Sequence, residues 1–333
     1  MNRTEVGTGP SGPVFFLLLL AAVLPGCVPR ATQPPTVALH EVHQSGAHRI
    51  AFDPAGRRLA SGGLHGRIHV WSVTDGARLQ SIDAHHDRIT GLAWLDDGRV
   101  ISADHSGWLL VTDVATASAL TRMRLPAVDD LAVSPDGAWV ATIDAGGIRK
   151  LALPGLQLMA QRTLPESPLA LAIDRAAARI AVSGRDRRVW LLDRGLRILA
   201  ELPRPSRDTY ALAFAPDGAT LLGGGWFKLL AWQLDSDRLE EYPTEHLGKI
   251  SSVAVSPDGA HWLSLGRITD SRLLMMDAVT HRVERRFRSH ALCGQQARFS
   301  PDGRYAASSS DDGSVYIYDL AEPYAPVVPR IDE

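Results

Sequence analysis

Residues 299–319 read FSPDGRYAASSSDDGSVYIYD and contain the pattern that decides the fold. A Pro-Asp-Gly turn at residues 301–303 follows an apolar strand, and about fifteen residues later an alternating strand ends at Tyr318 and Asp319. Asp-Gly between two hydrophobic strands is a strong hairpin signal, because glycine supplies the positive φ that such turns require. We therefore expect adjacent antiparallel strands in this stretch.

The same pattern recurs along the chain. The last residue of the turn, or of a looser copy of it, falls at positions 56, 98, 137, 177, 218, 259 and 303. The end of the alternating strand recurs at Trp71-Ser72, Thr112-Asp113, Leu151-Ala152, Leu192-Asp193, Trp232-Gln233, Met276-Asp277 and Tyr318-Asp319. A fixed period of this kind is the signature of a repeat architecture, so we predict seven units of about forty residues.

A histidine adds a third landmark. It lies nine residues before the end of the first strand in four repeats, as His43, His85, His246 and His290. Together the landmarks resemble the WD-repeat family, whose repeat has a histidine near its start and Trp-Asp at its end. The resemblance covers residues 36–320. It implies an all-β, seven-bladed β-propeller with four antiparallel strands in each blade.

The resemblance also implies a structural role for these histidines, in a buried network of His, Ser or Thr, Asp and an aromatic side chain. Repeat seven keeps all four residue types, at His290, Ser308, Asp312 and Tyr318. Repeat one has His65 where the aspartate belongs. We therefore expect a complete network in blade seven only. Buried polar groups that satisfy one another stabilise one particular packing of a blade.

The two ends of the repeat region are out of phase by one strand. Residues 36–39 occupy the place in their repeat that residues 79–83 occupy in the next. We expect 36–39 to complete blade seven beside residues 315–319, which closes the ring and leaves no long unpaired edge. Residues 321–333 form a tail outside the pattern.

The N-terminus reads as an export signal. Residues 14–24 are an unbroken apolar run, typical of a signal peptide and shorter than the about 20 residues that span a bilayer. Leu24-Pro25-Gly26-Cys27 resembles the lipobox of bacterial lipoproteins, in which the cysteine is acylated and becomes the mature N-terminus. We expect a signal peptide at residues 1–26, lipidation of Cys27 and a Pro-rich tether at residues 27–35. A signal peptide that is uncleaved or not lipidated is the alternative.

The lipoprotein resemblance implies a location. Val28, not Asp, follows the cysteine, which by family analogy favours the outer membrane with the domain facing the periplasm. An inner-membrane lipoprotein and a soluble periplasmic protein are the alternatives. Acylation of Cys27 would leave Cys293 without a partner, so no intrachain disulfide is expected.

Composition and motifs argue against several functions. Lys and Arg number 35 against 37 Asp and Glu, so no electrostatic drive toward nucleic acid exists. The twelve histidines show no metal-binding spacing, and the GxSxG, GxxxxGK[ST] and CxxCH motifs are absent. We expect no catalytic residue, no metal and no cofactor.

Partner-binding residues are expected on loops. In WD-repeat proteins the loops that lead into each first strand, and those that join the second and third strands, gather on the face most often used for partners. Interface-favoured side chains in these loops are Trp226, Phe227, Arg207, Tyr210, Arg185, Arg187, Trp108 and His105. The alternatives are that Trp226 or Trp108 packs between blades and that the charged loops are merely solvated.

Three functions remain open. The first is a membrane-anchored, non-catalytic, monomeric scaffold or adaptor that binds protein partners in the bacterial periplasm. The second is a periplasmic propeller enzyme or redox accessory protein with a cofactor or metal at the central funnel, against which the mostly Ala, Val, Leu and Ser composition of the first strands argues. The third is a sensor of a small ligand or of peptidoglycan.

Overall fold

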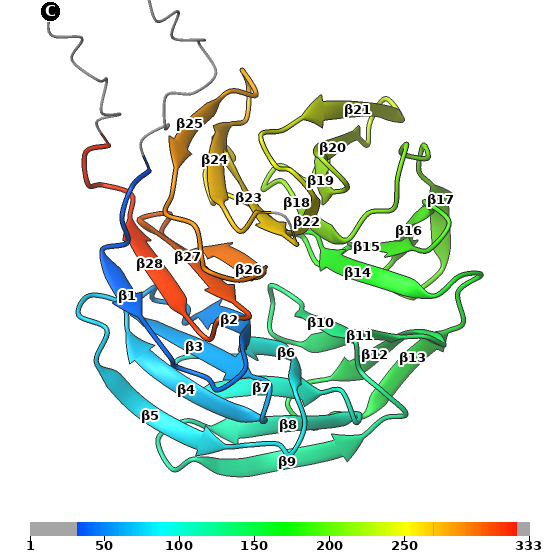
Figure 1. Cartoon of the computed structure of the whole chain (residues 1–333). Coiled ribbons are helices and arrows are strands. Elements are labelled where there is room, and N and C mark those ends of the chain that lie inside the picture. Colours follow the sequence, from blue (N-terminus) through cyan, green and yellow to red (C-terminus); the bar gives the residue numbers. More distant parts are fainter. Residues whose placement is uncertain (1–31, 269, 325–333) are drawn as a thin grey trace, which may run out of the picture.

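The fold is a ring of seven antiparallel sheets, each of four strands (Figure 1). The computed structural model describes residues 32–268 and 270–324, and within these ranges it contains β-strands and no helix. The predicted seven-bladed β-propeller is confirmed.

The blades follow one another in chain order. Blade one contains β2 (Ala47–Phe52), β3 (Arg58–Gly63), β4 (Arg67–Ser72) and β5 (Arg78–Asp83). Blade two contains β6 (Ile89–Trp94), β7 (Arg99–Asp104), β8 (Trp108–Asp113) and β9 (Ser118–Arg124). Blade three contains β10 (Asp130–Val133), β11 (Trp139–Asp144), β12 (Gly147–Ala152) and β13 (Leu158–Arg162). Blade four contains β14 (Pro168–Ile173), β15 (Arg179–Gly184), β16 (Val189–Asp193) and β17 (Ile198–Glu201).

The remaining blades repeat this order until the ring closes. Blade five contains β18 (Ala211–Phe214), β19 (Thr220–Gly224), β20 (Lys228–Gln233) and β21 (Arg238–Pro243). Blade six contains β22 (Lys249–Val255), β23 (His261–Arg267), β24 (Leu273–Asp277) and β25 (Val283–Arg286). Blade seven contains β26 (Gly294–Phe299), β27 (Tyr305–Ser310), β28 (Val315–Asp319) and β1 (Val37–Leu39).

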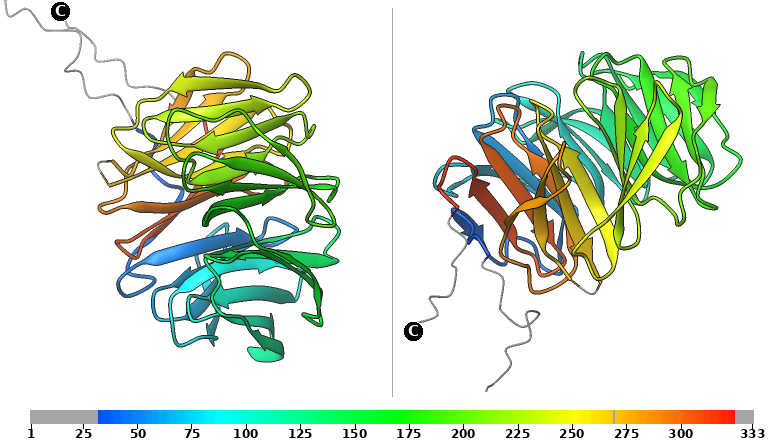
Figure 2. Two further views of the ribbon diagram at one scale, coloured as in Figure 1. Left: turned by 90° about the vertical axis from the view of Figure 1, so that its right-hand side faces the viewer. Right: turned by 90° about the horizontal axis from the view of Figure 1, so that it is seen from above.

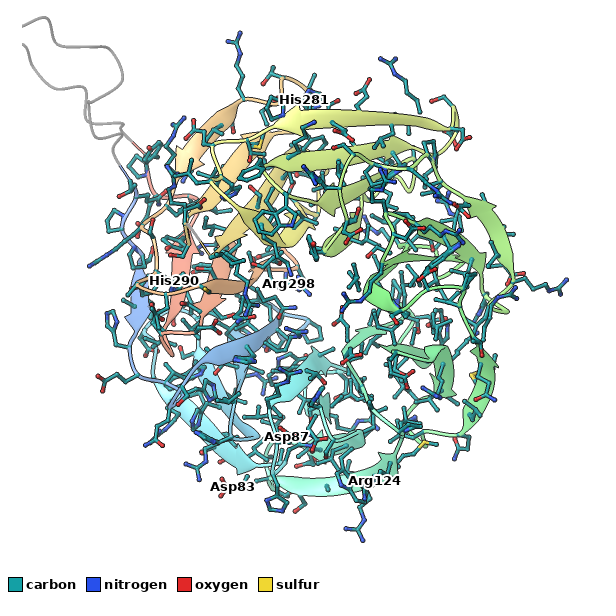
Figure 3. The ribbon with its side chains drawn as sticks, turned by 45° about the vertical axis from the view of Figure 1, so that its right-hand side comes forward. Asp83, Asp87, Arg124, His281, His290 and Arg298 are labelled. Carbon is teal, nitrogen blue, oxygen red and sulfur yellow. The ribbon has the colours of Figure 1, made fainter. Side chains whose placement is uncertain are left out.

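The core lies between neighbouring blades (Figure 3). One cluster packs Trp139 and Ile143 of blade three against Trp190 of blade four, all fully buried. Burial is nearly continuous along second and third strands such as β4, because a blade covers each of their faces, whereas the outer strand β5 is mostly exposed. Apolar area buried in this way is the main stabilising contribution.

Strand β1 closes the ring, as predicted. It pairs antiparallel with β28 in the register Val37 to Ile317 and Leu39 to Val315. The backbone N–H of Asp319 also donates to Thr36 Oγ1 at 2.9 Å. Both ends of the described chain leave the ring at the same edge (Figures 1 and 2). The blade that receives the last strand of the chain is therefore completed by the first.

The chain docks on the ring before the predicted domain start at residue 36. Gln33 is buried, and its backbone N–H donates to the Arg286 carbonyl at 2.7 Å while its own carbonyl accepts from Arg288 N–H at 2.8 Å. The segment predicted as a tether is thus attached to blade six by Gln33. The predicted signal peptide, Cys27 and residues 325–333 of the predicted tail lie outside the described residues.

Candidate partner-binding face

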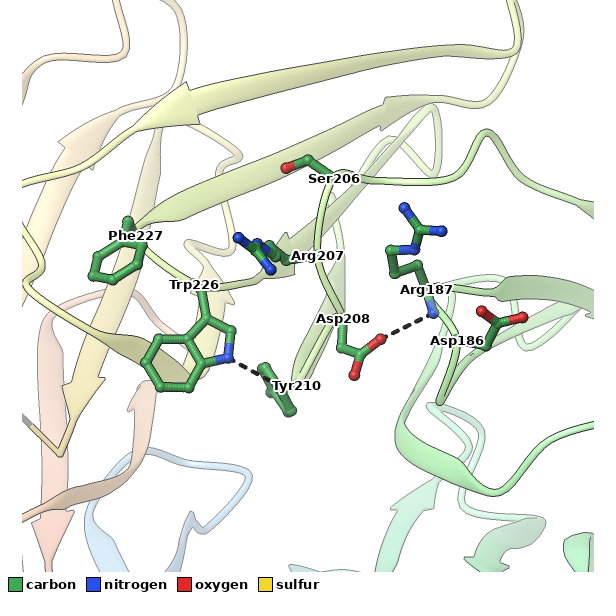
Figure 4. A pocket seen from close by; sticks show the side chains of 8 residues that line it. All are labelled: Asp186, Arg187, Ser206, Arg207, Asp208, Tyr210, Trp226 and Phe227. Carbon is green, nitrogen blue, oxygen red and sulfur yellow. Dashed lines mark hydrogen bonds between the residues drawn. The ribbon is translucent and has the colours of Figure 1, made fainter.

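Five of the predicted partner-binding residues line one pocket. Its volume is about 620 Å³, and it lies between the loops of blades four and five (Figure 4). The lining residues are Asp186, Arg187, Ser206, Arg207, Asp208, Tyr210, Trp226 and Phe227. They come from the β15–β16 hairpin, from the loop that leads into β18 and from the β19–β20 hairpin. The pocket is therefore built by the two classes of loop that were expected to share a face.

Hydrogen bonds hold these loops in place. The Trp226 indole N–H donates to the Tyr210 hydroxyl at 3.1 Å, and the backbone N–H of Arg187 donates to Asp208 Oδ1 at 2.9 Å. The tip of the β19–β20 hairpin also pairs with the chain before β22, since Phe227 N–H donates to the Gly248 carbonyl at 2.9 Å. Trp226 is half-buried, so it is both fixed and accessible.

Three pocket residues have left-handed backbones. Asp186, Arg187 and Phe227 have φ values of 65°, 61° and 65°. This region is unfavourable for a bulky side chain, and strain of this kind concentrates at binding sites. The carbonyl of Phe227 is held by Thr244, whose N–H and hydroxyl donate to it at 3.0 and 2.9 Å. The strained backbone keeps the Phe227 ring exposed at the edge of the pocket.

The pocket offers two guanidinium groups. Within residues 32–268 and 270–324, no carboxylate oxygen lies within 4 Å of the side chain of Arg187 or of Arg207. Asp186 instead lies 3.8 Å from Arg188 and 3.9 Å from Arg204. An arginine without an intramolecular acid can bind a carboxylate of a partner through two parallel hydrogen bonds.

Lys249 lies close to this pocket. Its Nζ is 3.8 Å from the centroid of the Tyr210 ring, a cation–π contact. Burial, together with the positive charges of Arg267 and Arg185, lowers the pKa of Lys249 to about 8. Lys249 thus adds a third basic side chain beside the two arginines of the pocket.

Exposed apolar side chains extend the face, and three of them, Leu247, Ile268 and Leu292, were not singled out from the sequence. Phe227 is 50% exposed, Leu247 62%, Ile268 60% and Leu292 57%. Leu247 and Leu292 closely follow the landmark positions of His246 and His290, so an apolar residue in a loop that leads into a first strand was the available signal. These four side chains lie in loops at the same ends of the blades as the pocket loops.

Three predicted residues lie outside the pocket. Arg185 is exposed in the β15–β16 hairpin without lining it. His105 and Trp108 belong to blade two, where His105 Nδ1 accepts a hydrogen bond from Arg88 at 3.1 Å and the Arg124 guanidinium lies 5.7 Å from the Trp108 ring centroid. The structure therefore separates these two residues from the blade-five group.

Blades two and six contain buried hydrogen-bond networks of three residues, His, Ser and Asp. In blade two, His85 contacts Asp104 through Nδ1 at 3.0 Å and Ser102 through Nε2 at 2.8 Å. In blade six, His246 contacts Asp270 and Ser264 in the same way, both at 2.9 Å. Blades two and six thus contain His, Ser and Asp in contact, but they have Thr112 and Met276 at the aromatic position, so neither holds the four residue types expected in blade seven. In blade one the His43 ring reaches Ser61 at 2.9 Å, and Trp71 donates to the same hydroxyl.

In blade seven a serine separates the histidine from the acid. His290 contacts Ser308 at 2.8 Å and Ser314 at 2.7 Å, while Asp312 lies 3.9 Å away and accepts from Ser314. The Tyr318 hydroxyl donates to the Arg288 carbonyl at 3.2 Å. The cause is a small residue after the turn glycine: Ser314 is short enough to bridge His290 and Asp312.

Acidification should destabilise the fold through these histidines. Burial lowers the pKa of His43 to about 3 and that of His290 to about 4, from 6.5. Between pH 6.5 and pH 4 the unfolded chain binds more protons than the folded chain. The stability that these histidines contribute is therefore complete above pH 6.5 and is lost as the pH falls toward 4, by about 1.4 kcal/mol per pH unit for each such histidine. Urea unfolding midpoints at several pH values measure this loss. A His290→Gln variant should lose less stability on acidification, and an equal loss in both proteins would contradict the assignment.

Two further features of the described ranges bear on function. Residues 32–268 and 270–324 contain no group of three or more His, Cys, Asp or Glu side chains that could hold a metal ion. The same ranges contain no helix that could cross a bilayer.

Comparisons with known proteins identify WD40 repeats in this chain. Residues 36–72, 76–113 and 283–319 match the family described as WD domain, G-beta repeat. Each match begins at or near the outer strand of one blade and ends with the third strand of the next, for example β1 followed by β2 to β4. The sequence repeat is therefore shifted by one strand relative to the blade, and the same shift places β1 in blade seven.

Several relatives are similar to parts of the chain. Telomerase protein component 1 of Rattus norvegicus is 27% identical over 65% of the chain, and Autophagy-related protein 16 of Arabidopsis thaliana is 23% identical over 88%. Guanine nucleotide-binding protein subunit beta of Arabidopsis thaliana is 23% identical over 77%. The matched regions span 8%, 51% and 62% of these relatives, respectively, so the chain covers less than two thirds of each.

Proposed function

We propose that this chain, a seven-bladed propeller with WD40 repeats, is a non-catalytic scaffold or adaptor that binds a protein partner on its loop face and is held at a bacterial membrane by a lipid on Cys27. The single observation that carries the docking proposal is the pocket of about 620 Å³ that gathers Trp226, Tyr210, Arg187 and Arg207. WD40 propellers typically bind proteins, and Trp, Tyr and Arg dominate binding hot spots.

The pocket and its surroundings indicate the chemistry of the partner. Two guanidinium groups lie beside aromatic rings, and exposed Phe227 and Leu247 continue the surface toward blade six. A segment with an apolar side chain flanked by a carboxylate fits this arrangement, because the apolar group fills the aromatic part while the acid pairs with arginine.

The proposed anchor is compatible with an accessible pocket. Cys27 precedes the docked Gln33 by six residues, so a lipid on Cys27 would lie within about 20 Å of the edge formed by blades six and seven. Blades four and five lie across the ring from β1 (Figure 1). A partner could therefore reach the pocket while the opposite edge of the ring is held at the membrane. We propose that this membrane is the outer membrane and that the propeller faces the periplasm.

The docking proposal predicts loss of a specific partner on mutation of the pocket. A Trp226→Ala, Arg207→Ala double variant removes the indole that donates to Tyr210 and one free guanidinium, so capture of the partner from detergent-solubilised membranes should fall at least about tenfold. Phe227→Gly should also weaken capture, yet it should leave the fold at least as stable because glycine adopts the φ of 65° without strain.

The matched control changes two exposed residues that do not line the pocket, Leu158 on the outer strand β13 and Arg197 in the turn before β17. Leu158→Ala with Arg197→Ala removes a similar apolar group and a similar charge far from the pocket, and it should leave capture unchanged. Equal capture by the wild type and by all the variants would rule out docking at this pocket.

A further inference from the structure

The central channel has a constriction lined by charged groups. A cavity of about 620 Å³ occupies one end of the channel, and a smaller one of about 90 Å³ lies toward the loop face. The residues that line both cavities form the boundary between them, and they are Asp130, Arg298, Leu171, Leu212 and Val253. Figure 3 shows Arg298 beside the centre of the ring. The constriction is therefore reached from the loop face through the smaller cavity.

Two cations at this constriction share one acid. Arg49 Nη2 lies 3.9 Å from Asp130 Oδ1, and its Nε donates to the Thr90 carbonyl at 2.7 Å. Arg298 donates to the Ala297 carbonyl at 3.0 Å, and within the described part of the chain no carboxylate oxygen lies within 4 Å of its guanidinium. One carboxylate cannot neutralise both guanidinium groups, so a net positive charge remains at these partly buried side chains.

Burial shifts the pKa values of Arg298 and Asp130. Burial lowers the pKa of Arg298 to about 10, although Asp130 counteracts the effect. Burial also raises the pKa of Asp130, in spite of Arg49 and Arg298. Burial therefore disfavours the charged form of both groups.

Further donors line the smaller cavity. Gln296 is buried and accepts from the Ile50 N–H through Oε1 at 2.7 Å, so its amide NH₂ is the group available to donate. Tyr210 lines both this cavity and the partner pocket. A group that enters from the loop face would thus meet hydrogen-bond donors on its way to Arg298.

We propose that the constriction of the channel binds a small oxyanion of the carboxylate or phosphate type between Arg298, Arg49 and Gln296. The planar guanidinium of Arg298 would donate two parallel hydrogen bonds to the oxyanion, and the ligand would supply the missing negative charge. This site does not depend on the proposed docking of a protein partner, because its charges lie in the channel.

The oxyanion could be a free solute or an acidic side chain, and two kinds of probe distinguish them. Acetate and inorganic phosphate test a free anion, and a hexaglutamate peptide tests a side chain that reaches in from the loop face. We expect at least one probe to raise the thermal unfolding midpoint of the full chain above that in sodium chloride of equal ionic strength.

Substitutions at the channel constriction test the proposal. Arg298→Gln should lower the affinity for the anion at least about tenfold, whereas Asp130→Asn should raise the affinity because a repelling carboxylate is removed. Arg197→Gln on the outer face is the matched control and should have no effect. The proposal is overturned if no probe raises the midpoint, or if the affinity is the same in wild type, Asp130→Asn and the control. If Arg298→Gln does not fold, the affinities of the wild type and of Asp130→Asn for the anion still test the proposal.

Discussion

A chain that begins at His40 will unfold at a temperature about 10 °C below that of a chain that begins at Thr32, because it lacks the strand that completes blade seven. Leu39 is buried and Val37 partly buried in the cluster shared with Val315 and Ile317, and full burial of one such side chain contributes about 1.5–3 kcal/mol. Loss of the β1–β28 hydrogen bonds adds about 1 kcal/mol per bond. The total of several kcal/mol corresponds to a shift of that size.

The shortened chain should also aggregate. Without β1, the backbone of β28 is an unpaired edge that can template pairing with another chain. Thermal unfolding and light scattering measure the two effects. The chain that begins at Thr32 is the control, because it keeps β1 and the backbone bonds of Gln33. Equal midpoints and equal solubility of the two chains would show that β1 does not stabilise the ring.

The second large effect is expected at Cys27. In a bacterial host supplied with an alkyne-labelled fatty acid, the wild type should incorporate the label and Cys27→Ala should incorporate none. The thiol is the proposed acylation site, and each buried methylene of the attached chains adds about 0.8 kcal/mol to membrane binding. The proposal also predicts that the mature wild-type chain has lost residues 1–26 by mass spectrometry.

Cys293→Ala is the matched control for this experiment. Cys293 is half-buried and carries no disulfide, so its replacement should leave both the label and the mature mass, apart from the substitution itself, unchanged. Label that persists in Cys27→Ala, or a wild type without label, would refute the proposed anchor and the location inferred from it. The docking proposal would remain open, because it depends on the pocket only.

The repeat landmarks predicted more of the fold than of the site. The turns and strand ends are local and periodic, so their number gave the blade count directly. The shift of residues 36–39 relative to residues 79–83 predicted which blade the N-terminal strand completes. The buried hydrogen-bond networks were harder to predict from the sequence, because the aspartate of each network lies at a different position relative to the strands. Asp104 ends β7, whereas Asp270 lies in the hairpin between β23 and β24.

The predicted partner-binding residues show the same division. Their placement on loops followed from the repeat, but their distances did not: Trp226 and Arg187 line one pocket, whereas Trp108 lies in blade two. Likewise Arg49, Asp130 and Arg298 are far apart in sequence and meet only at the channel. The amino-acid sequence alone determined the count, order and closure of the blades, because turns and strand periods depend on neighbouring residues. Only the tertiary structure decided which side chains share a pocket or a charge, since ring closure brings together residues from distant repeats.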